Sequence, residues 1–243
     1  MRVEAEPAYV LHTRPYRETS QLVELFTFNY GRIRAVAKGS RGRAKGRGTL
    51  FPFVQLSVGW GGRGELKSLY GAESDGYPIH LQGEQLYTGF YLNELLLRTL
   101  PEQDAHQAVF HQYSRLLHSL AGDCELQPLL RQFELTLLQS LGYELVLDTT
   151  ADTCEPVKPG RSYGYSPQLG LLSEYDPRTH TAKTLYDGGH LLAIARSEYS
   201  DASILHTAKR LLRTALAPHL GDKPLQSREL FRQARKIDSE NDT

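Results

Sequence analysis

The first 80 residues contain five short segments in which apolar and polar side chains follow the period of a β-strand. In the second segment Leu22, Glu24 and Phe26 share one face, and Val23 and Leu25 share the other. Turn-forming residues separate the segments, and no helical period long enough for a βαβ crossover lies between them. Five strands in so short a stretch predict a small closed barrel, of which the OB-fold is the type that binds oligonucleotides. We expect the strands at Ala8–His12, Gln21–Phe28, Arg32–Ala37, Leu50–Val58 and Glu65–Tyr70.

From Gln82 onward the apolar pattern becomes helical. The clearest segment, Leu126–Leu141, repeats apolar residues at i, i+3, i+4 and i+7 and ends before Gly142. Further helices are expected from Gln82 to Pro101 and at 104–120, 189–195, 201–216 and 227–236, with an irregular, proline-containing insertion at about 148–188. The chain is therefore predicted to be α+β, with an OB-fold domain at 1–80 and a mainly α-helical domain at 81–243.

Charge is distributed unevenly along a chain whose formal net charge is zero. Residues 1–80 hold 12 Lys and Arg against 7 Asp and Glu, a net of +5, whereas the other 163 hold 16 against 21, a net of −5. No acid occurs between Glu24 and Glu65, so we expect nothing inside the protein to neutralise the cations of this segment locally. A phosphate backbone is the simplest partner for such a segment, and a solvated basic loop is the alternative.

Three sets of cations are candidates for DNA binding. The first lies in the acid-free segment, the second on the expected helix at 201–216, and the third forms a stripe at i, i+4 and i+7 near the C-terminus. The candidates are Arg32, Arg34, Lys38, Arg41, Arg43, Lys45, Arg47, Lys209, Arg210, Arg213, Arg228, Arg232 and Arg235. Phe26, Phe28, Tyr30 and Trp60 could stack on bases, although we expect half or more of them to be barrel core.

Other classes of protein are disfavoured by composition and motifs. The longest uncharged stretch, 48–62, is shorter than the ~20 apolar residues that a membrane helix needs. The opening residues MRVEAEPAYVLHTR contain acids and no apolar core typical of a signal peptide, which predicts a cytoplasmic, nucleoid-associated protein. Two cysteines, Cys124 and Cys154, cannot form a disulfide framework.

No arrangement of residues predicts catalysis, a metal or a cofactor. The histidines lack metal-ligand spacing, no serine lies in a nucleophile elbow, and neither cysteine has an activating neighbour. Glu174, Asp176 and His180 are close in sequence and leave a hydrolytic enzyme as one alternative. An RNA-binding OB-fold module is another, because a basic barrel does not by itself distinguish the two sugars.

Three separated segments resemble the bacterial recombination mediator family RecO. They read YVLHTRPYRETSQLVELFTFNYGRIRAVAKGSR, LLRQFELTLLQSLGYEL and GDKPLQSRELFR, and they occur in the family's order over nearly the whole chain. The resemblance implies an OB-fold followed by a helical domain, and binding of single- and double-stranded DNA with annealing of complementary strands. It also implies that RecA is helped to load on DNA coated with single-stranded DNA-binding protein, together with RecR and in some settings RecF.

Two further expectations follow from this resemblance. Many family members carry a four-cysteine zinc module in the insertion, but here only Cys154 lies there, so we predict no zinc. The acidic C-terminal tail of single-stranded DNA-binding protein, which ends in phenylalanine, needs basic groups beside an apolar pocket. Arg131, adjoining the Leu126–Leu141 face, and Arg115, beside Leu116, are the candidate anchors.

Overall fold

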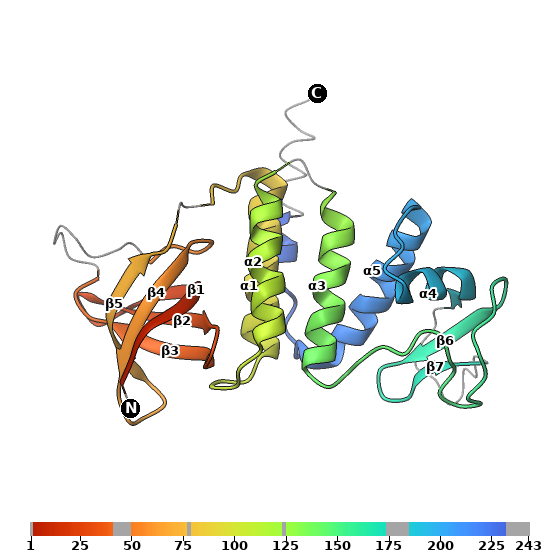
Figure 1. Ribbon diagram of the computed structural model, residues 1–243, viewed down its shortest axis with the longest axis horizontal. Helices are drawn as coiled ribbons and strands as arrows, with labels where there is room; N and C mark the ends of the chain where they lie inside the picture. Colours follow the sequence, from red (N-terminus) through yellow and green to blue (C-terminus); the bar gives the residue numbers. More distant parts are fainter. Residues whose placement is uncertain (1, 41–49, 77–78, 123–124, 174–184, 232–243) are drawn as a thin grey trace. The chain divides into compact units, whose positions relative to one another are not determined.

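The computed structural model describes residues 2–40, 50–76, 79–122, 125–173 and 185–231 (Figure 1). The chain forms two compact units. One, here called the barrel unit, comprises Met1–Cys124 and Asp222–Thr243; the other, the helical unit, comprises Glu125–Gly221. The boundary expected at residue 80 follows the change in secondary structure, whereas packing places the first two helices and the C-terminal segment with the barrel.

Five strands close into a barrel in the order β1-β2-β3-β5-β4 (Figure 1). β3 and β5 pair in parallel and the other neighbours are antiparallel, which is the connectivity of an OB-fold. The expected fold class is therefore confirmed. The strands are β1 Arg2–Tyr16, β2 Ser20–Thr27, β3 Gly31–Ala37, β4 Gln55–Gly61 and β5 Lys67–Ser74.

β1 is much longer than the expected Ala8–His12 because it pairs with two neighbours. Its first half pairs with β4 and its second half with β2, and the two pairings overlap at Ala8 and Tyr9. The register shifts between Val3 and Glu6 and again between Val10 and His12. Such bulges bend a strand and increase its twist, which allows one strand to close a small barrel.

β4 also differs from the expected Leu50–Val58, beginning at Gln55 and continuing to Gly61. Pro52 cannot donate to a strand ladder and Phe53 has a φ of 65°, so the segment before Gln55 is not extended. At the other end Trp60 is buried in the barrel core, with its ring 5.3 Å from that of Tyr30 in edge-on contact. The glycine-rich run around Trp60 is therefore partly strand, because the Trp60 side chain fills the barrel core.

Two helices of the barrel unit, α1 Gly83–Thr99 and α2 Gln107–Leu120, pack on the outer face of β1 and β2. The Tyr9 ring on β1 lies 5.0 Å from the ring of Tyr113 and 5.4 Å from that of Phe110. Tyr113 donates a hydrogen bond to the Asn93 amide oxygen at 2.6 Å, and the Asn93 amide donates to the carbonyl of Leu11 at 3.0 Å. This buried chain of hydrogen bonds ties α2, α1 and β1 together.

The helical unit contains α3 Leu126–Ser140, α4 Gly188–Ala195, α5 Ala202–Leu216 and the short 3-10 turn η1 Ala217–His219. α3 packs against α5 through the apolar face expected from the sequence. The insertion forms a small sheet in the order β7-β6-β8, from β6 Ser162–Ser166, β7 Gly170–Leu172 and β8 Tyr186–Asp187 (Figure 1). No helix in the described ranges is long and apolar enough to span a membrane.

Gly31, at the start of β3, is required by both its conformation and its surroundings. Its φ is 64°, and a Cβ atom placed there would lie 1.7 Å from the backbone oxygen of Asp104. We expect Gly31→Ala to lower the free energy of unfolding by roughly 1–3 kcal/mol, because the loop at Asp104 must move away. Urea unfolding followed by circular dichroism measures the change.

The matched control for that substitution is Gly64→Ala, since no atom lies within 4 Å of the Cβ position there. The control should change the stability by less than about 0.5 kcal/mol. Equal stability of the parent and Gly31→Ala would contradict the close approach of Asp104 to β3.

Candidate nucleic-acid interface

Arg32 and Arg34, the first two candidates in the acid-free segment, are engaged in ion pairs. Arg34 Nε lies 2.9 Å from a carboxylate oxygen of Glu24, and Arg32 Nη1 lies 3.1 Å from the other. β-pairing aligns Glu24 with Arg34, which places the three side chains on one outer face of the barrel. The expectation that no acid neutralises these cations was therefore wrong, because the partner strand supplies one across the sheet.

Glu102, in the loop after α1, completes this network. Its carboxylate lies 2.7 Å from Arg34 Nη2 and 3.6 Å from Arg32 Nη2. Arg32 Nε also donates to the carbonyl of Leu100 at 3.1 Å, and its own carbonyl accepts from Gln103 N. The Arg32 side chain is only 14% exposed. Arg32 thus joins β3 to the loop after α1, a structural role that leaves little of its charge available to DNA.

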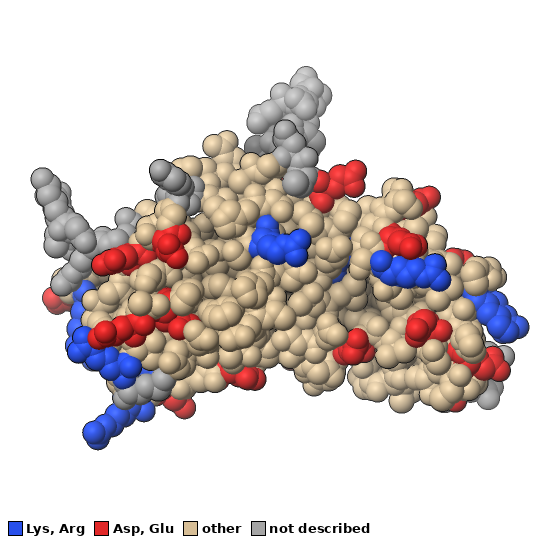
Figure 2. Space-filling model, viewed as in Figure 1, with Lys and Arg blue, Asp and Glu red and all other residues tan. Residues whose placement is uncertain are grey.

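Lys38, at the end of β3, lies in a different environment from these two arginines. It is exposed, whereas Val36 and Ala37 just before it are buried. Arg41, Arg43, Lys45 and Arg47 follow it in sequence and lie outside the described residues. Figure 2 shows lysine and arginine side chains gathered at the outer end of the barrel, with acidic side chains directly beside them.

Two of the four aromatic side chains considered for base stacking belong to protein cores. Phe26 is fully buried, with its ring 5.3 Å from that of Phe110, and Trp60 is 2% exposed. Phe28 and Tyr30 are half-buried, and each packs its ring edge-on against another aromatic ring. Trp60 belongs to the barrel core that was expected to hold half or more of the set, and Tyr30 packs half-buried against that core. Phe26 is instead buried outside the barrel, against α2.

The second cation set lies on one face of α5 in the helical unit. Lys209, Arg210 and Arg213 are all exposed, whereas Leu211 and Leu212 on the opposite face are fully buried. The Arg210 guanidinium lies 5.5 Å from the centre of the Tyr186 ring, a cation–π contact that leaves the charge at the surface. α5 contains no acidic residue, so the face has no i,i+4 partner of opposite sign within its own helix.

The third set belongs to the barrel unit through Arg228. Its guanidinium lies 5.9 Å from the centre of the Tyr91 ring on α1. Arg232 and Arg235 lie outside the described residues. The helix expected to begin at Ser227 begins one residue earlier, at Gln226.

The two arginines expected to anchor a partner's acidic tail lie in different compact units and differ in exposure. Arg115 is exposed on α2 of the barrel unit. Arg131 is buried on α3 of the helical unit, where its Nη1 lies 2.9 Å from Glu134 and its side chain is 6% exposed. Tyr199 lies in the same environment, and burial raises its pKa to about 12. Arg131 is therefore enclosed within its own unit, and only Arg115 is presented to solvent.

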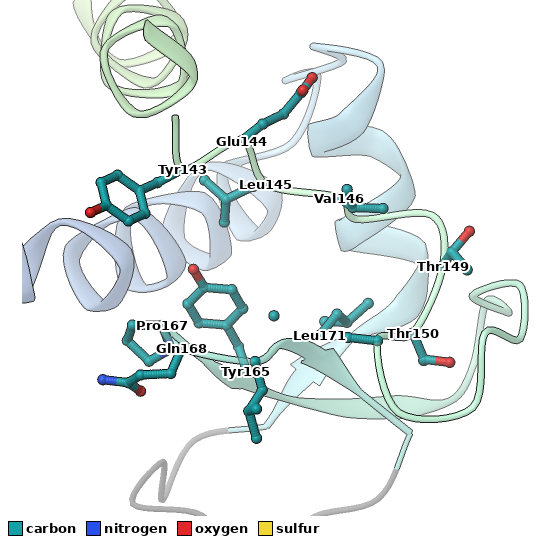
Figure 3. A pocket seen from close by; sticks show the side chains of 13 residues that line it. Tyr143, Glu144, Leu145, Val146, Thr149, Thr150, Tyr165, Pro167, Gln168 and Leu171 are labelled. Atoms are coloured by element: carbon teal, nitrogen blue, oxygen red, sulfur yellow. The ribbon is translucent and has the colours of Figure 1, made fainter. Parts of the chain in front are cut away.

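The helical unit contains a hollow of about 360 Å³ beside the insertion sheet (Figure 3). Tyr143 and Val146 line one side of it, and Tyr165 and Leu171 line another. Glu144 is the only charged residue among those that line this hollow in the described structure. Its size suits an aromatic ring, but its charge does not suit an acidic peptide.

Comparisons with known proteins agree with this architecture. Residues 1–76 match the model described as Recombination protein O N terminal, and residues 80–229 match Recombination protein O C terminal. The chain belongs to the RecO family. Proteins named DNA repair protein RecO are similar to it over nearly their whole length. That of Cellvibrio japonicus is 48% identical over 236 residues, covering 95% of this chain and 98% of the relative.

Two further relatives show the same extent of similarity. The protein of Pseudomonas aeruginosa strain LESB58 is 47% identical over 228 residues, covering 93% of this chain and 94% of its own. That of Nitrosococcus oceani is 48% identical over 242 residues, covering 98% of this chain and 96% of the relative. RecO proteins are non-enzymatic recombination mediators in DNA repair, and this chain is one of them. Glu174, Asp176 and His180, the hydrolytic alternative, lie outside the described residues.

In this RecO chain, hydrogen bonds hold together the part of the insertion in which zinc ligands were considered. Cys154 is exposed and Cys124 lies outside the described residues. Asp152 accepts hydrogen bonds from the Ser173 hydroxyl at 2.7 Å and from its backbone N–H, which joins the insertion loop to β7. Thr150 Oγ1 accepts from Glu155 N at 3.1 Å and closes the turn that contains Cys154.

The different roles of Arg32 and Lys38 can be separated by substitution. We expect Arg32→Ala to lower the free energy of unfolding by about 1–3 kcal/mol, because Glu24 and the Leu100 carbonyl lose a buried donor. Lys38→Ala should change the stability by less than about 0.5 kcal/mol and should weaken DNA binding instead. Thermal unfolding and fluorescence anisotropy with a labelled oligonucleotide measure the two effects. If both variants weakened DNA binding equally at unchanged stability, the structural role of Arg32 would be wrong.

Proposed function

We propose that this chain binds single- and double-stranded DNA without sequence preference and anneals complementary strands. We further propose that it helps load RecA on DNA coated with single-stranded DNA-binding protein, acting with RecR and in some settings RecF. The observation that carries the proposal is an OB-fold barrel bearing an acid-free, cation-rich segment in a chain of the RecO family. The proposed location is the bacterial cytoplasm, in association with the nucleoid.

Annealing of this kind needs no catalytic residue. Two complementary strands are polyanions that repel each other, and a surface of lysine and arginine that holds both lowers the repulsion. Base pairing then supplies the free energy and the sequence specificity. The protein contributes only contacts to phosphates, for which exposed cations such as Lys38, Lys209 and Arg213 are suited because they do not read base edges.

The experiment that tests this function is strand annealing on DNA coated with single-stranded DNA-binding protein, with and without the chain. The proposal expects faster annealing in its presence. Matched DNA and RNA oligonucleotides in a binding assay separate it from an RNA-binding module, since tighter binding to RNA favours the alternative. Annealing at the same rate without the chain would overturn the proposed function.

The basic segment supplies a sharper prediction. Replacing Arg41, Arg43, Lys45 and Arg47 together by alanine should weaken binding to all DNA sequences alike. The plot of log affinity against log salt should become shallower by about 0.7–0.9 for each phosphate that the variant no longer binds. Anisotropy titrations at several salt concentrations measure the slope. A slope equal to that of the parent would assign the segment to a solvated loop.

For the acidic tail of single-stranded DNA-binding protein, the substitution to test is Arg115→Glu. Reversal at Arg131 would place a second carboxylate beside Glu134 in a buried site and would lower stability whatever binds there. We expect Arg115→Glu to weaken binding of the tail peptide severalfold, because the exposed guanidinium is removed. Arg14→Glu, an equal change of charge at another exposed arginine of the barrel unit, is the control and should not alter peptide binding.

The peptide assay is read together with binding to naked DNA, which Arg115→Glu should leave intact. Tail binding as tight as that of the parent would place the site elsewhere in the chain.

A further inference from the structure

The C-terminal segment lies along one face of α1 within the barrel unit. Tyr87, Tyr91, Glu94 and Arg98 are three or four residues apart on that helix and therefore share a face. Each contacts a part of the C-terminal segment, and the order along α1 is the reverse of that along the segment. Arg98 donates hydrogen bonds to the carbonyls of Lys223 and Pro224, and Glu94 accepts from Gln226 and Ser227. Further along the segment, the Arg228 guanidinium lies over the Tyr91 ring, and Phe231 packs against Tyr87.

Glu94 makes the most specific of these contacts. Its two carboxylate oxygens accept from Gln226 N at 3.0 Å, from Ser227 N at 2.9 Å and from Ser227 Oγ at 2.7 Å. Gln226 is also where the C-terminal helical turn begins. The first backbone N–H groups of a helix have no partner within it, and a carboxylate both accepts from them and favours the positive end of the helix. Glu94 is thus an N-terminal cap supplied by another helix.

The electrostatics of the site support a charged cap. Burial by itself would raise the pKa of Glu94, but the hydrogen bonds from Ser227 and Gln226 and the charge of Arg98 hold that pKa below its usual value. Arg98 lies 2.6 Å from the same carboxylate. The side chains of Glu94 and Arg98 are 15% and 20% exposed, and both Leu225 and Ser227 are buried. The start of the helical turn is therefore fixed to α1 by an ion pair and by charge-assisted hydrogen bonds.

We propose that Glu94 is a positioning residue for DNA binding, because it fixes the helical turn that carries Arg228. The inference rests on the proposed function, in which Arg228 and the other C-terminal cations contact DNA phosphates. Without the carboxylate, the turn loses the partner of its first N–H groups and its fixed register on α1. Arg228 then samples many positions and contacts the DNA strand less often.

The sign of the effect distinguishes this role from simple electrostatics. Glu94 is an acid in a unit proposed to bind a polyanion, so removal of its charge alone should strengthen DNA binding. Glutamine offers one acceptor oxygen where the carboxylate offers two. Its N–H₂ group would face the donors of Gln226 and Ser227 and could not accept from them. Glu94→Gln should therefore weaken DNA binding if Glu94 positions Arg228.

The test measures DNA affinity of the full chain against salt, using a labelled single-stranded oligonucleotide. Glu94→Gln should bind severalfold more weakly than the parent, with a slope shallower by about 0.7–0.9 for each phosphate that is no longer bound. The control is Glu18→Gln, which removes the same charge from an exposed position in the turn between β1 and β2 and should bind as tightly as the parent or more tightly. Ser227→Ala removes only the hydroxyl donor and should weaken binding less, in the same direction.

A double-mutant comparison separates this inference from the proposed function. The triple variant Arg228→Ala, Arg232→Ala, Arg235→Ala should lower the slope, and adding Glu94→Gln to it should lower the slope no further. If the triple variant kept the parent's slope, the C-terminal cations would not bind DNA, and that part of the proposed function would fail together with the inference. If the triple variant had a shallower slope while Glu94→Gln and Ser227→Ala kept the slope of the parent, the positioning role alone would be overturned.

Thermal unfolding of each variant verifies that it is folded. If Glu94→Gln is not folded, Ser227→Ala decides the question.

Discussion

The outer face of β1 and β2 packs against aromatic side chains of α2, and the arrangement of the barrel unit depends on this contact. Tyr9 and Phe26 on the strands meet Phe110 and Tyr113 on the helix, with ring centres 5.0–6.2 Å apart. Each such pair contributes ~0.5–1.5 kcal/mol beyond the area that it buries. The hydrogen bonds through Asn93 fix the distance between α1 and β1, and Gly31 allows the loop at Asp104 to approach β3.

This packing limits which parts of the barrel unit can contact DNA. The covered outer face carries Glu24, Arg32 and Arg34, and the ion pairs of the two arginines with Glu102 hold the loop after α1 against the barrel. Lys38, which follows β3, is exposed, and we propose that it and the cations after it in the sequence contact phosphates. The C-terminal segment brings Arg228 back to the same unit, so cations from both ends of the chain belong to one compact body. The basic face of α5 is a separate set on the helical unit, consistent with a protein proposed to hold two strands.

In the insertion, side-chain hydrogen bonds to the backbone join the loop around Cys154 to the small sheet. Asp152 accepts from the Ser173 hydroxyl and backbone, and these hydrogen bonds lower the pKa of its carboxyl although burial opposes that shift. Thr150 bonds to both the N–H and the carbonyl of Glu155. Side-chain bonds to the backbone therefore fix the turn that contains Cys154.

Patterns local in the sequence predicted the barrel, the helical stripes and the clustering of cations. Alternation over β2 placed Leu22, Glu24 and Phe26 on one face, as observed, because the faces of a strand follow from its backbone geometry alone. The length of β1 and the strand around Trp60 were missed, because barrel closure depends on pairing between distant segments. Local patterns also could not show which cations are available to a ligand. The pairing of Arg34 with Glu102 spans 68 residues and the capping of Ser227 by Glu94 spans 133, so only the tertiary structure brings these charges together.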